Sequence, residues 1–279
     1  MSLKGSASVK LSIIVPTIRP ENLRALHEST ANAINGRYEW EMVAIGPRNE
    51  NSFGFASYTE RFLQDDGSPC HCQQRALLHC EGDYVTWAAD DGIWLPGSLD
   101  RDWDDDAIIC KYMEGRPNWQ DDRWQGMDPK LRRDVQSYSR GEVGLNPDMV
   151  ALDSFWTIGY HKGAQVSGAS PDSQLLCLGI IKRSLLLDVG GWDEGYETAA
   201  QATVDLGLRL QACGTKFTLW SSIVQALGYD PKAERTALNA AYDADVQRYK
   251  TLWEGGSRGQ LPISPDADKP QQWERRTAK

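Results

Sequence analysis

The sequence lacks any apolar run long enough to span a bilayer, and its first ten residues show no signal-peptide pattern. It also lacks an excess of positive charge: the formal net charge is -9 at pH 7, which argues against a surface that binds nucleic acid. No internal repeat is visible. These absences favour a soluble protein of 279 residues, which can bury a large core as one domain with appendages.

The cysteines do not follow the pattern of a disulfide-rich secreted domain. They are spread along the chain at Cys70, Cys72, Cys80, Cys110, Cys177 and Cys213. This spread favours reduced thiols, so we expect a cytoplasmic protein. The cysteines around His71 and His79 could form a zinc cluster, but their spacing fits none of the common structural zinc patterns. Buried thiols on a helix are the better interpretation.

The first hundred residues alternate between strand-like and helix-like stretches. Strands are expected at Lys10–Val15, Trp40–Ile45, Tyr58–Leu63 and Asp83–Ala88, and helices at Pro20–Ile34 and Gln73–Cys80. This βαβ order predicts an α/β fold with a mostly parallel, Rossmann-like sheet flanked by helices.

The alternation of strand-like and helix-like stretches is interrupted after residue 100. Residues 101–174 form an insertion, and its polar stretch Gly115–Val143 is interpreted as a long, mobile excursion. Further strands are expected at Ala107–Met113, Leu175–Ile181 and Lys216–Trp220, and helices at Lys182–Val189, Thr203–Cys213 and Lys232–Trp253. We expect residues 9–230 to form one domain and residues 231–279 a C-terminal helix with a frayed tail.

Two adjacent carboxylates, Asp90 and Asp91, follow the strand expected over Asp83–Ala88. Carboxylates at a strand end in an α/β protein face the crevice where ligands bind. Such a pair can hold Mg²⁺ or Mn²⁺, and that cation can in turn hold a diphosphate. A solvated acidic turn is the plainer alternative, and the flanking sequence favours the metal site.

Four motifs in a fixed order carry a family resemblance. They are Leu11–Thr17, Glu81–Val85, Gly190–Glu194 and Asp205–Gly214. In this order they resemble the GT-A glycosyltransferases, especially the large inverting family 2 of nucleotide-sugar glycosyltransferases. The resemblance implies a GT-A fold with an acceptor-side insertion, a donor that is expected to be a UDP-sugar, and Mn²⁺ or Mg²⁺ as cofactor at Asp90 and Asp91.

The resemblance also implies which residues bind the donor. In the family, the loop after the first strand wraps the nucleotide, and here it carries Pro16, Thr17 and Arg19. Arg19 could meet a phosphate through its guanidinium fork. Gly67 and Gln73 stand in the places of the family's glycine loop and Arg-Asn pair, where a role in helix-start packing is about as plausible. Asp90 is expected to reach the ribose or the metal.

Two departures from the family concern this donor side. The stretch Ile45–Pro47 replaces the acidic residue that usually contacts the base, so base specificity is not carried over. Ala88 and Ala89 precede Asp90, so the usual aspartate two positions before Asp91 is absent. The resemblance therefore implies a metal site with fewer carboxylates than the common version.

The largest departure concerns the catalytic base, which an inverting enzyme needs in order to deprotonate the acceptor hydroxyl. Ala202 and Thr203 stand where the family has a Glu-Asp pair. Asp205, near the expected start of its helix, is the candidate base that remains closest in sequence, although it could be a plain helix-start charge. The nearby alternatives are Asp193, Glu194 and Glu197. A displaced base, a retaining route and an inactive protein all stay open.

Four tryptophans are candidates for the acceptor side: Trp119, Trp124, Trp156 and Trp192. An indole offers a large apolar face with a polar tip, which suits stacking on a sugar ring. Each of them could instead pack on the domain.

The sequence thus predicts a metal-dependent glycosyltransferase of the hexosyl type that moves a sugar from a nucleotide-sugar to a glycan or another hydroxyl acceptor. Its partners would be small molecules or glycans, with no nucleic acid. The first alternative is a non-catalytic protein of the same fold that binds a nucleotide or glycan, which the missing Glu-Asp pair would suit. The second is a sugar nucleotidyltransferase, although Pro16–Arg19 lacks the glycine-rich phosphate loop of that class.

Overall fold

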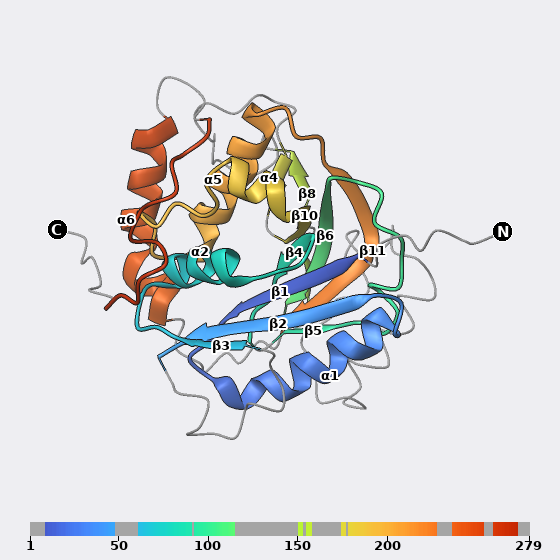
Figure 1. Cartoon of the computed structure of the whole chain (residues 1–279). Helices are drawn as coiled ribbons and strands as arrows, with labels where there is room; N and C mark the ends of the chain where they lie inside the picture. Colours follow the sequence, from blue (N-terminus) through green and yellow to red (C-terminus); the bar gives the residue numbers. More distant parts are fainter. Residues whose placement is uncertain are drawn as a thin grey trace.

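The computed structural model describes residues 9–47, 61–90, 92–114, 150–152, 155–157, 174–176, 178–227, 236–253 and 259–272. Within these ranges the chain forms one large mixed sheet and a separate two-stranded ladder, with helices packed on both faces of the sheet (Figure 1). None of the described helices is long and apolar enough to cross a membrane.

The first half of the sheet is entirely parallel and has apolar strands. These are β1 (Lys10–Pro16), β2 (Glu39–Gly46), β3 (Arg61–Gln64) and β4 (Tyr84–Trp87). Their spatial order is β3-β2-β1-β4, so β1 lies between two partners and its run Leu11–Val15 is buried. Because the strands are parallel, their carboxyl ends all meet at one edge. The predicted βαβ half-sheet is therefore confirmed.

The second half of the sheet mixes directions. Its strands are β5 (Gly92–Trp94), β6 (Ala107–Glu114), β7 (Val150–Leu152), β10 (Gly179–Lys182) and β11 (Thr218–Leu227). β10 runs antiparallel to both β4 and β6, β11 is parallel to β6, and β5 is antiparallel to β11. β7 pairs with β6.

The ladder outside this sheet joins β8 (Phe155–Thr157) to β9 (Gln174–Leu176). The single strand expected over Leu175–Ile181 is therefore wrong. Its first part pairs with β8, whereas its second part, β10, pairs with β4 and β6. An apolar run shows burial, but it does not show where a strand changes partners.

The helices are η1 (Pro20–Asn22), α1 (Leu23–Ile34), α2 (Pro69–His79), α4 (Arg183–Asp188), α5 (Ala199–Ala212) and α6 (Thr236–Trp253). Figure 1 shows α1 on one side of the sheet and α2, α5 and α6 on the other. α2 begins before the expected Gln73 because Ser68 caps it, accepting a hydrogen bond from His71 N at 3.3 Å. α5 begins four residues before the expected Thr203.

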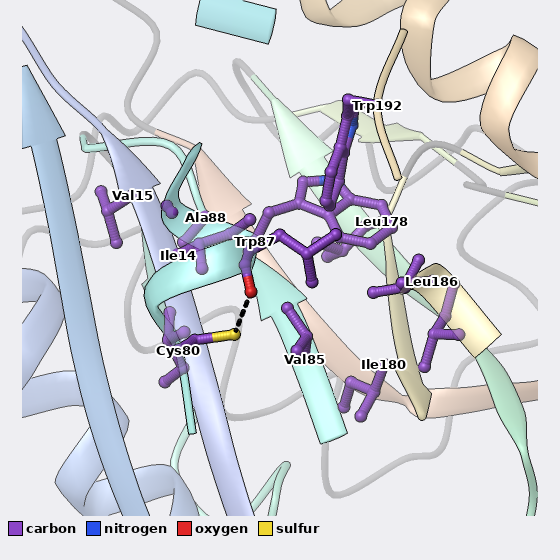
Figure 2. Close-up of a cluster of buried hydrophobic side chains, with 14 of the residues drawn as sticks. Ile14, Val15, Cys80, Val85, Trp87, Ala88, Leu178, Ile180, Leu186 and Trp192 are labelled. Atoms are coloured by element: carbon purple, nitrogen blue, oxygen red, sulfur yellow. Dashed lines mark hydrogen bonds between the residues drawn. The ribbon is translucent and has the colours of Figure 1, made fainter. Parts of the chain in front are cut away.

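The core beside β4 is a cluster of buried side chains (Figure 2). Trp87 at the end of β4 and Trp192 in the turn after α4 meet edge to face, with ring centroids 5.2 Å apart and planes at 89°. Val85, Ile180 and Leu186 surround them and are buried. Each such aliphatic side chain contributes about 1.5–3 kcal/mol through burial. The cluster fixes the end of β4 relative to the turn after α4.

Residues 259–272 pack on the domain, although the chain after α6 is expected to fray. Leu261 N donates a hydrogen bond to Val189 O at 3.1 Å, and Asp66 forms a β-bridge with Gln272. Gly190 has a φ of +88°, and a Cβ there would overlap the carbonyl oxygen of Leu261, so only glycine fits this crossing. The expectation of a frayed tail is therefore corrected for these residues, while 254–258 and 273–279 lie outside the described ranges.

Candidate functional site

The carboxyl ends of the parallel strands are tied together by backbone hydrogen bonds. Thr17 N donates to Ile45 O at 2.8 Å, and Asp65 N donates to Gly46 O at 2.9 Å. Gly46 has no room for a side chain, because a Cβ there would overlap the carbonyl oxygen of Thr17. The loops after β1, β2 and β3 therefore leave the sheet from fixed positions, at the edge where α/β proteins bind ligands.

Asp90 lies at this edge, in the turn after β4, and its side chain is only 6% exposed. Asp90 Oδ2 accepts hydrogen bonds from Thr17 Oγ1 at 2.8 Å and from Arg19 Nε at 3.3 Å. Arg19 Nη2 donates to Oδ1, so the guanidinium grips both carboxylate oxygens. Pro16 ends β1 directly before this cluster. The structure thus brings these expected donor-side residues together, whereas Asp91 lies outside the described residues.

Gly67 and Gln73 flank the first turn of α2. Gly67 N donates to Asp65 Oδ1 at 2.8 Å, and a Cβ at Gly67 would press on the ring of His71. Gln73 is buried, and its Oε1 has no hydrogen-bond partner among the described residues. A buried amide oxygen of this kind is costly until a ligand or a water donates to it. The neighbouring Gln74 is structural, since both ends of its amide bind the backbone of the turn after α4.

A buried charge network links α2 to the turn after α4, and sequence reasoning missed it. His71 contacts Asp65 through Nε2 at 3.3 Å and Glu194 through Nδ1. Burial lowers the pKa of His71, but hydrogen bonds with these two carboxylates outweigh it and raise the pKa to about 9. Arg75 also donates to Asp65 Oδ2 at 2.8 Å. His71 is therefore a cation at neutral pH that is held between two carboxylates.

The alternative of a zinc cluster at Cys70 and Cys72 finds no support in the described residues, which contain no group of three or more potential metal ligands. Both thiols are buried, and Cys70 Sγ donates to the backbone oxygen of Thr198 at 3.1 Å. Burial raises the pKa of both thiols. One feature of the sequence could have indicated the charge network. The acidic Asp65 lies just before α2, and His71 lies in the first turn of this helix.

Asp205 is part of a structural ion pair, which corrects the expectation that it is the catalytic base. It lies more than one turn past the start of α5 and is fully buried. Its Oδ2 accepts from Arg209 Nε at 2.8 Å, and its Oδ1 accepts from Trp253 Nε1 at 2.9 Å. Arg209 also donates to two backbone carbonyls of the turn after α4, at 2.6 Å each. A base must reach the acceptor hydroxyl directly or through one water, and this closed network prevents that.

The alternative carboxylates in the turn before α5 differ in exposure. Asp193 is 10% exposed and pairs with Arg248 at 2.9 Å, and Glu197 is buried beside Asp245 of α6. The Glu194 side chain is 18% exposed and is held through Oε1 by His71. Of the three carboxylates, Glu194 is therefore the most exposed, and His71 orients it.

The four tryptophans predicted for the acceptor side differ in what the structure shows of them. Trp192 is buried against Trp87 (Figure 2), so its indole has no open face for a sugar and this expectation is corrected. Trp156 is placed on β8 by its backbone alone. Trp119 and Trp124 lie outside the described residues, as does the whole stretch Gly115–Val143, and remain predictions.

Comparisons with known proteins address the fold. Neither protein-family models nor curated protein sequences match this chain. Among solved structures, a mannosyltransferase from Pyrobaculum calidifontis in complex with GDP-Man and Mn²⁺ matches with a TM-score of 0.53 at 14% identity, over 91% of this chain and 67% of its own. The chain therefore has a GT-A-like fold. S. aureus TarS matches with a TM-score of 0.52 at 16% identity, over 89% of this chain and 40% of its own.

These likenesses confirm the predicted fold class, and at such identities they establish the fold alone. Membership of the inverting family 2 does not follow from them. The chain also spans only 40% of the length of TarS. The activity of the GT-A-like domain must therefore be argued from its own residues.

Among the described residues of the GT-A-like domain, Asp90 is the predicted ligand of a cation. Asp90 offers one buried carboxylate, but Arg19 holds both of its oxygens. Asp91 lies outside the described ranges. Mg²⁺ and Mn²⁺ are commonly held by one or two carboxylates together with phosphate oxygens, so Asp90 and Asp91 fit a cation that arrives with a diphosphate. Arg19 must release Asp90 for that to happen.

Proposed function

We propose that this protein transfers a sugar from a nucleotide-sugar donor to a hydroxyl acceptor such as a glycan. The observation that carries the proposal is the buried Asp90 carboxylate, which Thr17 and Arg19 orient at the carboxyl edge of a GT-A-like sheet. Gln73 adds a buried amide oxygen without a partner among the described residues, near Gly67 at the start of α2. Both features suit a polar ligand at this edge.

The proposed donor is a UDP-sugar, bound with Mn²⁺ or Mg²⁺ at Asp90 and Asp91. The mannosyltransferase from P. calidifontis was solved with GDP-Man and Mn²⁺, so GDP-linked sugars are the competing donors. A cation bound there would offset the charge that develops on the diphosphate leaving group.

We propose inversion at the sugar carbon, with Glu194 as the group that takes the proton from the acceptor hydroxyl. Glu194 is the most exposed of the three carboxylates before α5, and His71 fixes its orientation. Replacing a general base typically lowers the rate by about 10²–10⁴. Glu194→Gln should therefore abolish most transfer while donor affinity, measured by calorimetry, is retained. Glu197→Gln is the matched control, and a larger rate loss there would move the role to Glu197.

The first experiment is a thermal-shift panel of UDP- and GDP-linked sugars, followed by donor hydrolysis with and without Mn²⁺. A ligand present at 100 times its dissociation constant adds about 2.7 kcal/mol to the free energy of unfolding, which such a panel detects. Stabilisation by one donor together with its hydrolysis supports the enzyme. If no nucleotide-sugar shifts the unfolding temperature, the proposed function is wrong.

The metal assignment has a test of its own. Calorimetry of UDP with Mn²⁺ should show that Asp91→Ala weakens binding and that chelator does the same. Asp102→Ala is the control, because Asp102 is an exposed aspartate that pairs with Arg37 on the surface. Unchanged affinity in Asp91→Ala and in chelator would remove Asp91 and the cation from the donor site.

A non-catalytic nucleotide- or glycan-binding protein is the second candidate. The observation that favours it is the absence of carboxylates at Ala202 and Thr203, together with the closed network around Asp205. Donor binding without hydrolysis or transfer to any offered acceptor would decide for the binding protein.

The proposal includes a reducing compartment such as the cytoplasm. The cysteines of the described ranges are free thiols, and burial raises the pKa of Cys70 and Cys110, which keeps those two thiols protonated. Fractionation of cells that produce the protein would test this placement.

A further inference from the structure

The cluster around Asp90 contains a cation of its own. Arg19 presents Nε and Nη2 to the two oxygens of Asp90, which is the paired geometry that guanidinium groups use with carboxylates and phosphates alike. Thr17 Oγ1 adds a third donor at 2.8 Å. The carboxylate that the proposed cation needs is thus already neutralised by the protein.

The Arg19 side chain is the more exposed member of its pair with Asp90. It is 39% exposed, whereas the Asp90 side chain is 6% exposed. The Arg19 backbone is held separately, because its N–H donates to Thr17 Oγ1 at 3.0 Å. The Asp90 carboxylate therefore keeps a donor, Thr17 Oγ1 on Oδ2, when the guanidinium changes its partner.

The sequence around Asp90 makes this neutralisation more important. The two residues before Asp90 are Ala88 and Ala89, so Asp91 is the one carboxylate adjacent to it in the sequence. A cation held by so few carboxylates gains little from the protein alone and relies on diphosphate oxygens for the rest of its ligands.

We propose that Arg19 is an exchangeable counter-ion: it occupies the place of the cation on Asp90 in the free protein and transfers to a diphosphate oxygen when a cation and a nucleoside diphosphate enter together. This inference rests on the proposed function. Two cations cannot share one buried carboxylate without repulsion, so Arg19 opposes a cation that arrives alone. The diphosphate removes this opposition by giving the guanidinium a new anionic partner. Cation and nucleotide therefore bind as a pair.

The test measures Mn²⁺ and UDP binding separately and together, by electron paramagnetic resonance for free Mn²⁺ and by calorimetry for UDP. In the wild type, Mn²⁺ alone should bind weakly and UDP should strengthen it. In Arg19→Gln, affinity for Mn²⁺ alone should rise about tenfold, equivalent to ~1.4 kcal/mol, while affinity for UDP in the presence of Mn²⁺ should fall by a similar factor. The coupling between the two ligands should shrink accordingly.

Two further variants separate the effect of the charge of Arg19 from that of its guanidinium geometry and provide a control. Arg19→Lys keeps the charge but loses the fork, so Mn²⁺ alone should still bind weakly while UDP affinity falls. Arg24→Gln removes an arginine that is 65% exposed and pairs with Glu28 on α1, and it should leave both affinities unchanged. The unfolding temperature of each variant verifies that it is folded.

The outcomes separate this inference from the proposed function. Unchanged or lower Mn²⁺ affinity in Arg19→Gln overturns the exchange. If neither UDP nor GDP binds the wild type, the donor site is wrong. A gain in Mn²⁺ affinity in Arg19→Gln would then still support Arg19 as the counter-ion of Asp90.

Discussion

Two buried aspartates of this protein each pair with an arginine, and the two pairs differ in the surroundings of the arginine. In the pair Asp205–Arg209 both side chains are 0% exposed, and Arg209 is also bound to backbone carbonyls. In the pair Asp90–Arg19 the carboxylate is buried but the guanidinium is 39% exposed. The first pair is closed on every side, while the second can exchange its cation. The two pairs thus differ in the burial of the cation, and the proposed exchange at Asp90 rests on this difference.

The closed pair should give the largest effect on stability. Arg209→Met keeps the length of the side chain but leaves Asp205 as an uncompensated buried charge, which costs about 3–5 kcal/mol of unfolding free energy. Urea unfolding measures this loss. Arg24→Met, on the exposed face of α1, should stay within about 0.5 kcal/mol of the wild type. A loss below about 1 kcal/mol in Arg209→Met would contradict the structural role of the pair.

The network around His71 provides a third case, whose cation can be removed by pH. The pKa of His71 rises from 6.5 to about 9 in the folded protein, so its contribution is fully present below pH 6.5 and is lost as pH rises through 9. The upper limit is about 3–4 kcal/mol, because each pKa unit corresponds to about 1.4 kcal/mol. The groups that face the ring are Asp65 and Glu194, and Arg75 in turn donates to Asp65.

Urea unfolding at pH 6 and pH 9.5 tests this dependence. The buried thiols also titrate in the unfolded chain at high pH. The comparison is therefore with His71→Gln, which should lose less stability over the same interval because it has no imidazolium to discharge. Equal pH dependence in the two proteins would show that His71 is not the group responsible.

The indole that completes the closed pair should contribute less. Trp253→Phe removes the hydrogen bond from Nε1 to Asp205 Oδ1 and should cost about 1–3 kcal/mol beyond the loss of ring volume, because the buried acceptor is left short of a donor. Trp103→Phe is the matched control, since Trp103 is buried and its Nε1 has no partner among the described residues. Equal losses in the two variants would assign the effect of Trp253 to packing alone.

The smallest expected effect on stability belongs to the exchangeable pair. Arg19→Gln should lower the unfolding free energy by about 1 kcal/mol or less, because an exposed cation gains little and Thr17 still binds the carboxylate. The same urea series as for Arg209→Met provides the comparison. A loss of about 3 kcal/mol or more would make this pair as structural as the other one, and Arg19 would not be free to exchange.

The parallel half of the sheet and the proximity of Thr17, Arg19 and Asp90 could be predicted from the sequence, for a physical reason. Buried parallel strands appear as short apolar runs, and Thr17, Arg19 and Asp90 directly follow such runs, so they had to meet at one edge. The antiparallel β10 was less visible, because its pairing with β4 and β6 depends on partners far away in the chain.

The error at Asp205 has a similar origin. The N-cap Thr198 makes no side-chain cap hydrogen bond, so the start of α5 carries no local signal. Asp245 of α6 instead holds the residues just before the helix, accepting hydrogen bonds from the backbone N–H groups of Glu197 and Thr198. A contact supplied by another helix cannot be found from the local sequence pattern. The helix therefore begins earlier than predicted. As a result, Asp205 lies in the interior of the helix and not in its first turn, where it was expected.

The packing of residues 259–272 has a consequence for the synthesis of the protein. The carboxylate of Asp65 accepts a hydrogen bond at 3.2 Å from the backbone N–H of Gln271, which lies 206 positions later in the sequence. At a translation rate of about 5–20 residues per second, Gln271 is synthesised roughly 10–40 s after Asp65. During that interval the edge beside Gly67 is incomplete. A nascent chain that is stalled or cut before Gln271 would therefore lack this donor to Asp65 at the edge beside Gly67.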